Sequence, residues 1–571
     1  GSLSTTTAGT SNFRAGASAG VGILSGGNYN VVIGDGAGEF LTTGDNSVFV
    51  GFEAGKGITG TKLTGGDNVG VGYRAGYSLR GTATRNTIVG YTAADALTTG
   101  DQNTVMGYDA LGAGIASYYN TAFGTGALRA DTTGRNSVAV GISALYSQNT
   151  TGSADMFNTA VGSGSGFNVS TGFKSTYIGG NAGYFATTAD TTTFVGFKAG
   201  QGIDGAKLTG NHNVAVGANA GLLLQGAAAE NTVVGTDSGD AITTGTRTVA
   251  VGYNAGGGIT TGDSNVAIGW QALLTEDAHS NNVAVGASAL QTQNAGAHAY
   301  NVAVGFEAGK IITDGANNTF VGGLAGDGTD DGAKNVAVGT SSLSANCGDK
   351  NTAVGYAAGF ATTGADNTVV GHEAGKGLLG GTGNTLIGSS AGDAITTGDS
   401  NVQLGYLTAA SAVDVDAEIV IGPGVTGSGG STVTIGSGAG KISNTFTSNA
   451  TWAQSSDSRL KTNIQADTLG LSFINRLNPV TYKWKPSNDI DKSLPYYKEV
   501  NERDTSITMH GLVAQEVKTA LDAEGVDTFA GWGEGLDGVQ TISREMFVSP
   551  LVKAVQELST KLDAALARIA T

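Results

Sequence analysis

The pentapeptide Asn335-Val336-Ala337-Val338-Gly339 is one copy of the motif that decides the fold of this chain. The motif reads Asn-(Val/Thr)-x-(aliphatic)-Gly, and its 24 copies have closing glycines that run from Gly34 to Gly436. The usual interval is 17 residues, with a few intervals of 14, 16, 18, 19 or 21. Because so short a repeat cannot bury its own apolar face, the pattern predicts a solenoid of stacked parallel strands.

Individual motif positions predict how the turns stack. The residues three and one before the Gly are β-preferring in all 24 copies, which places them on one face of a strand. The residue between them varies and is often Ala, which leaves room for another chain, so we expect that face to be an oligomer contact. The Asn occurs in 17 copies and predicts an amide ladder. At a strand spacing of about 4.8 Å, the stack would extend roughly 110 Å.

A longer duplication lies above the short repeat. The stretch Phe52-Glu53-Ala54-Gly55 recurs 145 residues later as Phe197-Lys198-Ala199-Gly200. Aromatic residues also follow the motif Gly on consecutive turns, and they are candidates for stacking on host glycans, with surface filling or chain packing as the alternative. These residues are Phe52, Tyr73, Tyr91 and Tyr108.

Composition excludes several classes of protein. The 571 residues include 95 Gly and only 5 Pro, without a collagen period, and the net charge of −17 argues against nucleic-acid binding. No apolar run is long enough for membrane insertion, and Cys347 stands alone, so no internal disulfide is expected. The Gly-x-Gly strings lack a phosphate-binding context, the calcium-binding nonapeptide is absent, and no metal site is indicated, so we expect no cofactor and no metal.

The chain divides into two unlike parts at Ser456. Before it, 88 of 455 residues are Gly, whereas only 7 of the last 116 are. We expect a lead-in at 1–27, which starts with a Gly1-Ser2 pair typical of cloning, and a repeat shaft at 28–440. A connector at 441–455 and a separate domain at 456–571 follow.

Four segments of the C-terminal part carry a family resemblance. They begin with Ser456-Asp457-Ser458-Arg459-Leu460-Lys461 and continue with Leu477-Asn478-Pro479-Val480, His510-Gly511-Leu512-Val513 and Val548-Ser549-Pro550-Leu551. In this order they resemble the endosialidase-type intramolecular chaperone, an autoprocessing domain that ends many phage tail spikes and fibres. The shaft resembles the head repeats of trimeric autotransporter adhesins, as in Asn136 to Gly141, and similar repeats of phage tail fibres. That resemblance implies a trimeric parallel β-roll.

The chaperone resemblance implies a catalytic dyad of Ser456 and Lys461 that cuts the chain at the Ser. A Ser hydroxyl needs an adjacent base, and Lys serves as one when burial or a nearby positive charge favours its neutral amine. Arg459 is a candidate for that charge, and we expect the cut between Ser455 and Ser456, with the following bond as second choice. Alternatively, Ser456 or Asp457 caps a helix and Lys461 lies on its wet face. His510 is a second possible supporting residue, although a lone His is more often structural.

The last helix predicts a coiled-coil seam. Its apolar residues follow a 4-3-4-3-4 spacing, which suits association of three chains, and the alternative is one amphipathic helix docked on its own domain. The seam residues are Leu551, Val555, Leu558, Leu562, Ala565 and Ile569.

Taken with the resemblance, these patterns predict a mainly β protein: a solenoid shaft followed by a small α/β chaperone domain. We expect the self-cleaving precursor of a homotrimeric phage tail fibre or spike, made in the host cytoplasm and carried in the virion tail. Its partners would be two further copies, other tail proteins and a host receptor, with a glycan as one candidate. The alternatives are a bacterial trimeric surface adhesin, which should carry a signal peptide and a membrane anchor, and a polysaccharide-degrading tail spike, which needs paired carboxylates.

Overall fold

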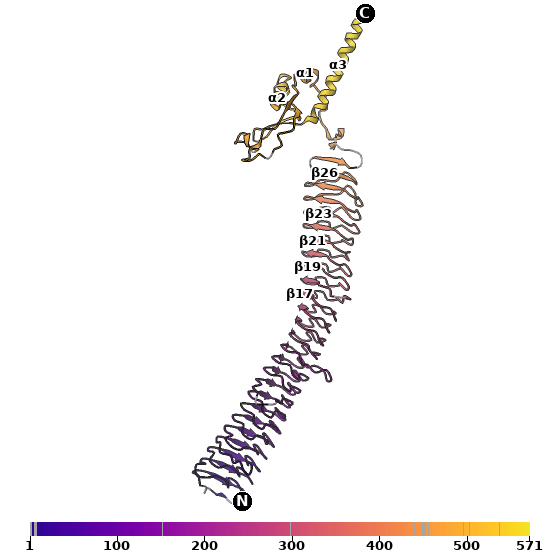
Figure 1. The fold of residues 1–571 in the computed structure, drawn as a ribbon. Helices are drawn as coiled ribbons and strands as arrows, with labels where there is room; N and C mark the ends of the chain where they lie inside the picture. The colour runs from indigo at the N-terminus through magenta and orange to yellow at the C-terminus, as the bar shows by residue number, and fades with distance from the viewer. Residues whose placement is uncertain are drawn as a thin grey trace. The chain divides into compact units, whose positions relative to one another are not determined.

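A computed structural model of the chain describes residues 3–4, 8–150, 152, 154–296, 298–438, 440–446, 453–454, 456–494, 496–501, 503–535 and 537–570. The chain forms two compact units, Gly1–Ser455 and Ser456–Thr571. The first is a parallel β-solenoid of about 25 turns, in which one short strand of each turn stacks on the next (Figure 1).

The solenoid strands are three residues long for most of the stack. Strands β2 to β26 pair in parallel with their neighbours in sequence, and the parallel stack starts at β2, ahead of residue 28. The strands are β1 (Leu3–Ser4), β2 (Phe13–Ala15), β3 (Val31–Ile33), β4 (Val48–Val50), β5 (Val69–Val71), β6 (Thr87–Val89), β7 (Thr104–Met106), β8 (Thr121–Phe123), β9 (Val138–Val140), β10 (Thr159–Val161), β11 (Thr176–Ile178), β12 (Thr193–Val195), β13 (Val214–Val216), β14 (Thr232–Val234), β15 (Val249–Val251), β16 (Val266–Ile268), β17 (Val283–Val285), β18 (Val302–Val304), β19 (Thr319–Val321), β20 (Val336–Val338), β21 (Thr352–Val354), β22 (Thr368–Val370), β23 (Thr385–Ile387), β24 (Val402–Leu404), β25 (Ile419–Ile421), β26 (Thr432–Ser437), β27 (Gly440–Thr445) and β28 (Ala453–Gln454).

The motif Gly ends each strand and permits the close stacking of turns. Gly141 has a φ of +135°, a left-handed value that side chains disfavour. A Cβ added there would lie 2.4 Å from the carbonyl oxygen of Gly162 in the next turn. Glycine is therefore required both by the backbone conformation and by the approach of the neighbouring backbone.

The expected oligomer contact at the middle strand residue is wrong. Ala139, Ala215, Phe49 and Tyr177 occupy that position, and each is fully buried within its own chain. Successive residues of a strand point to opposite faces, and the chain wraps around the middle one, so small and large side chains together fill a thin core. The two flanking β-preferring residues point outward instead, as the half-buried or exposed ends of strands β3 to β25 show.

The predicted amide ladder is confirmed. Asn86 Nδ2 donates to Asn68 Oδ1 at 3.0 Å, and Asn103 Nδ2 donates to Asn86 Oδ1 at 2.9 Å. Asn103 also donates to the carbonyl of Ser117 at 2.8 Å, while its own Oδ1 accepts the backbone N–H of Asn120 at 3.1 Å. These buried amides are satisfied only when each turn lies on its sequence neighbour, so the ladder fixes the stacking.

The second unit is a small α/β domain that ends in a long helix. Its core consists of Leu469, Phe473, Val517, Leu521 and Phe547, together with Ala520. The elements are η1 (Ser458–Leu460), α1 (Leu471–Arg476), β29 (Val480–Tyr482), η2 (Ser487–Asp489), β30 (Met509–Gly511), α2 (Ala514–Ala523), β31 (Trp532–Glu534), β32 (Gln540–Ile542), η3 (Arg544–Phe547) and α3 (Val548–Ile569). Strands β29 and β30 pair antiparallel, as do β31 and β32.

Candidate functional site

The structure brings Ser456 and Lys461 together. Lys461 Nζ lies 2.6 Å from Ser456 Oγ, within hydrogen-bonding distance. The single turn η1 lies between the two residues, and both side chains are exposed to solvent. Ser455, the residue on the other side of the expected cut, lies outside the described residues. The pair has the contact that proton transfer from a hydroxyl to an amine requires.

Arg459 is bound to Asp457. Its Nη2 lies 2.7 Å from Asp457 Oδ2, and its Nε donates to the same carboxylate. The hydrogen bond from Arg459 holds the pKa of Asp457 below its usual range. Arg459 was expected to favour the neutral amine of Lys461 through its positive charge. In the structure the Asp457 carboxylate offsets that charge, so Arg459 is not the unpaired cation that this effect requires. Asp457 also caps η1, a role that the sequence offered as an alternative to catalysis.

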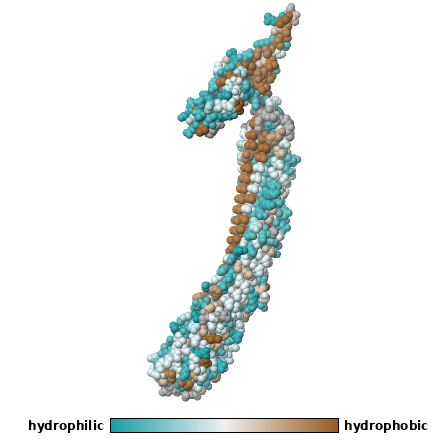
Figure 2. All heavy atoms as spheres, viewed as in Figure 1, coloured by the Kyte–Doolittle hydropathy of each residue, from teal (hydrophilic) through white to brown (hydrophobic). Residues whose placement is uncertain are grey.

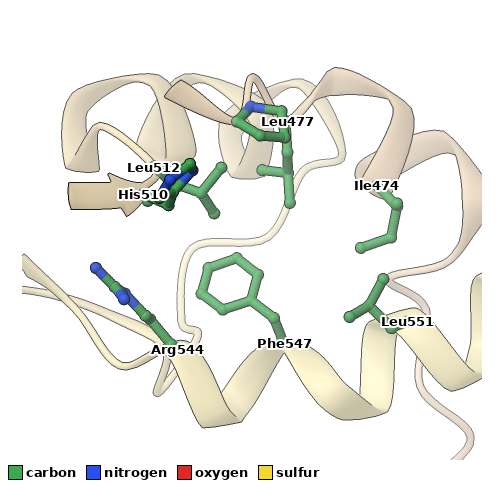
Figure 3. Close-up of a pocket in the computed structure, with 9 residues that line it drawn as sticks. Ile474, Leu477, His510, Leu512, Arg544, Phe547 and Leu551 are labelled. Carbon is green, nitrogen blue, oxygen red and sulfur yellow. The ribbon is translucent and has the colours of Figure 1, made fainter. Parts of the chain in front are cut away.

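His510 lies on β30 opposite Thr481 of β29 and lines an apolar pocket. The pocket has a volume of about 410 Å³, and neither Ser456 nor Lys461 lines it. In Figure 3, Phe547 at the end of η3 and Leu551 in the first turn of α3 point toward Ile474 and Leu477. In this structure His510 is thus part of a pocket wall, and its support of the Ser456–Lys461 pair stays a prediction.

The four aromatic residues that follow the motif Gly form one continuous stack. Ring centroids lie 5.4 Å apart between Phe52 and Tyr73, 4.7 Å between Tyr73 and Tyr91, and 5.6 Å between Tyr91 and Tyr108. The rings are nearly parallel and offset, and Phe52, Tyr91 and Tyr108 are each about half exposed, so part of each ring is open to other contacts. A second stack of Tyr146, Phe167 and Tyr184 was not foreseen from the sequence.

Figure 2 shows an apolar stripe along one side of the C-terminal half of the solenoid. We define this outward stripe as the residues three and one before the motif Gly in strands β3 to β25. None of its 46 positions carries a charged residue, although the protein as a whole has a net charge of −17. An uncharged, regularly spaced surface of this length is typical of an interface rather than of a solvated face.

The seam residues of α3 are also exposed. Leu551, Val555, Leu558 and Leu562 are each about half exposed, and Ile569 is exposed more fully. The other side of the helix start, with Pro550 and Ala554, is buried. The helix therefore docks on its own domain through its start, where Leu551 also lines the pocket, and the seam from Val555 onward is exposed in the described part of the chain.

Two buried acid–glutamine pairs interrupt the apolar core and were missed from the sequence. Gln148 Nε2 donates to Asp131 Oδ2 at 2.9 Å, and Gln293 Nε2 donates to Glu276 Oε2 at 2.8 Å. The members of the second pair follow those of the first by 145 residues, the period of the long duplication. Two features of the sequence could have revealed these pairs: their 145-residue period, and polar residues at positions where other turns have Leu or Ile.

No group of metal-ligating side chains occurs among the described residues, and no helix in that part of the chain is both long and apolar enough to cross a bilayer. Comparison with family models finds the chaperone of endosialidase at residues 456–526. Searches of the curated proteins and of the solved structures each find no match. The chain thus carries an endosialidase chaperone domain preceded by a β-solenoid, a combination that supports a tail fibre or spike type of protein and, in general terms, autoproteolysis.

Proposed function

From the match of residues 456–526 to the chaperone of endosialidase, we propose that the chain is the self-cleaving precursor of a homotrimeric tail fibre or spike. The observation that carries the proposal is the 2.6 Å contact between Lys461 Nζ and Ser456 Oγ at the junction of the two compact units. Cleavage at this junction separates a chaperone of 116 residues from the shaft.

Cleavage begins when the neutral amine of Lys461 removes the proton of Ser456 Oγ. The oxygen attacks the carbonyl carbon of the preceding residue, Ser455, through a five-membered intermediate. The C–N bond then breaks as Lys461 returns the proton to the Ser456 nitrogen, which leaves as an amine, and the acyl group is held as an ester on Oγ. Water hydrolyses the ester, which restores the hydroxyl and releases a new carboxylate. The bond after Ser456 is the second choice for the cut.

The Lys461 amine must be shielded from bulk solvent for this chemistry to be efficient, while one water still reaches the ester. A Lys amine is neutral near pH 7 only where burial or an unpaired positive charge disfavours its protonated form. Both dyad side chains are exposed in the isolated chain, and Arg459 is paired with Asp457. The proposal therefore includes a covering of the pair that other parts of the assembly provide.

The outward stripe supports self-association of the shaft. A standard interface uses about 20–30 residues from each partner, and the stripe offers 46 uncharged positions. Another copy of the same solenoid has the same spacing between strands, so its stripe can lie against this one turn by turn. Because every turn resembles the next, such chains can pair one turn out of step at little cost. A chaperone that joins the chains at one end through the exposed α3 seam removes that ambiguity.

After cleavage, the shaft forms the mature fibre in the virion tail and contacts other tail proteins and the host surface. The aromatic stack from Phe52 to Tyr108 offers ring edges for a receptor glycan. To test whether the stack binds a glycan, the mature wild-type shaft and Tyr91→Ala are compared for binding to a panel of host glycans. Equal binding by the two would contradict a role of the stack in glycan binding.

The test of the proposal is the mass of the purified protein. Wild-type chain is expected to yield a shaft that lacks 116 C-terminal residues, together with the released domain. Ser456→Ala and Lys461→Ala should each leave the chain intact, whereas Ser458→Ala, an exposed control in the same turn, should be cleaved normally. Persistent full-length wild-type trimer, or cleavage of Ser456→Ala, contradicts the proposal.

A further inference from the structure

We propose that Asp457 is a positioning residue for self-cleavage, because its side chain holds the turn that brings Ser456 and Lys461 into contact. This inference rests on the proposed function of that pair. It assigns Asp457 no contact with the reacting atoms, only with the backbone and side chain of Arg459.

The turn between the dyad residues is what makes their contact possible. An extended chain of five residues would span roughly 16 Å, too far for a hydroxyl and an amine to meet. Here η1 shortens the segment, with the N–H of Leu460 donating to the carbonyl of Asp457 and that of Lys461 to the carbonyl of Ser458, each at 3.1 Å. Lys461 leaves the turn in an extended conformation, and its side chain reaches back to Ser456.

The turn is held by local bonds rather than by packing. None of Ser458, Arg459 and Leu460 is buried, and a three-residue 3₁₀ turn is marginal without further support. Asp457 supplies that support, since its Oδ1 accepts the backbone N–H of Arg459 at 2.8 Å from an extended N-cap position. A capping side chain satisfies a backbone donor that the turn leaves free.

Arg459 fixes the cap in place. Its guanidinium contacts both oxygens of the Asp457 carboxylate, at 2.7 Å to Oδ2 and 3.1 Å to Oδ1. An exposed ion pair contributes little by itself, so the cap is expected to matter more than the pair. Because the cap is expected to contribute more than the ion pair, substitutions of Asp457 and of Arg459 should slow cleavage by different amounts.

The experiment follows the rate of cleavage of the full chain after cell-free synthesis, between pH 6 and pH 9. Asp457→Ala removes both the cap and the ion pair and should slow cleavage about tenfold. Asp457→Asn keeps an oxygen that caps the turn and should retain a rate within about threefold of wild type. Arg459→Gln keeps the cap and should lower the rate about twofold. The shape of the pH profile should not change in Asp457→Ala, because Lys461 still acts as the base.

The outcomes distinguish a positioning role from other roles. Wild-type speed in Asp457→Ala, an Asp457→Asn chain as slow as Asp457→Ala, or a shifted pH profile each overturns the inference, the last two in favour of an electrostatic role. Unfolding temperatures of Ser456→Ala and Ser456→Ala/Asp457→Ala should agree, and a lower value for the double variant would assign the slowing to lost folding. Cleavage of Ser456→Ala, or no cleavage of wild type, instead contradicts the proposed function.

Discussion

The side-chain amide of Gln148 donates a hydrogen bond to the fully buried carboxylate of Asp131 over 2.9 Å. The backbone N–H groups of Gly134 and Thr133 also donate to this carboxylate, so its recorded hydrogen-bond donors are uncharged. Burial raises the pKa of Asp131 because a charged carboxylate is poorly solvated in the core. The folded solenoid therefore binds this proton more tightly than the unfolded chain does.

The sign of the resulting pH dependence follows from linkage. The contribution of Asp131 to stability is fully present below about pH 4, the ordinary value, and is lost as the pH rises through the raised pKa. Asp131→Asn should remove this contribution and flatten the difference in stability between acidic and neutral pH. Urea unfolding of the shaft at several pH values measures the effect. The exposed Asp331→Asn serves as control, and equal slopes for Asp131→Asn and wild type would contradict the prediction.

The amide ladder predicts a local loss of stability in Asn103→Ala. The substitution leaves the carbonyl of Ser117 and the N–H of Asn120 without their partner, whereas Asn86 Oδ1 keeps the backbone N–H of residue 103. Each unsatisfied buried group costs about 1–3 kcal/mol, so we expect a loss of several kcal/mol centred on these turns. Hydrogen exchange should show faster exchange near residue 103 and unchanged exchange in distant turns, because a solenoid couples mainly nearest neighbours. The surface substitution Asn294→Ala should change neither region.

The repeat shows what sequence can and cannot predict. All 24 motif copies lie in strands, because the recurring β-preferring residues and the Gly determine local structure. The prediction that the middle residue faces another chain was wrong, because Ala at that position suits a thin core as well as a contact between chains. Phe49, Tyr177, Phe194 and Phe320 at that position, all fully buried, carried the evidence for a core.

The candidate site was predicted only in part. The family resemblance identified Ser456 and Lys461, but their contact depends on η1 and on the cap from Asp457. Arg459 was expected to act on Lys461, but it lies two residues from Asp457 as well as two from Lys461, and sequence alone does not decide which of them it contacts. Placement of these three charges depends on backbone angles that residue types do not specify.

The outward stripe predicts that Val251→Lys/Ile268→Lys blocks association of the shaft without unfolding a single chain. Both residues lie on the exposed side of adjacent strands β15 and β16, so the charges remain solvated in the isolated chain. In an assembly the same charges would be buried without partners, which costs several kcal/mol. Light scattering should show wild type as a trimer and the variant as a monomer with unchanged β-structure by circular dichroism. The exposed corner substitution Thr261→Lys should remain trimeric, and a trimeric double variant would exclude the stripe as the interface.

The seam of α3 predicts that Leu558→Glu impairs assembly at the chaperone end. Leu558 is 54% exposed in the single chain, so the substitution should leave the domain core of Phe473 and Phe547 intact. In a three-stranded coiled coil the same position is buried, and three carboxylates brought together there repel one another. We expect less trimer and, where cleavage needs the covered dyad, at least a tenfold slower release of the 116-residue domain. Ser559→Glu adds the same charge one residue later, outside the seam, and should assemble and cleave as wild type does. Equal cleavage and assembly of the two variants would show that the seam does not join the chains, and would leave α3 as a helix that serves its own domain alone.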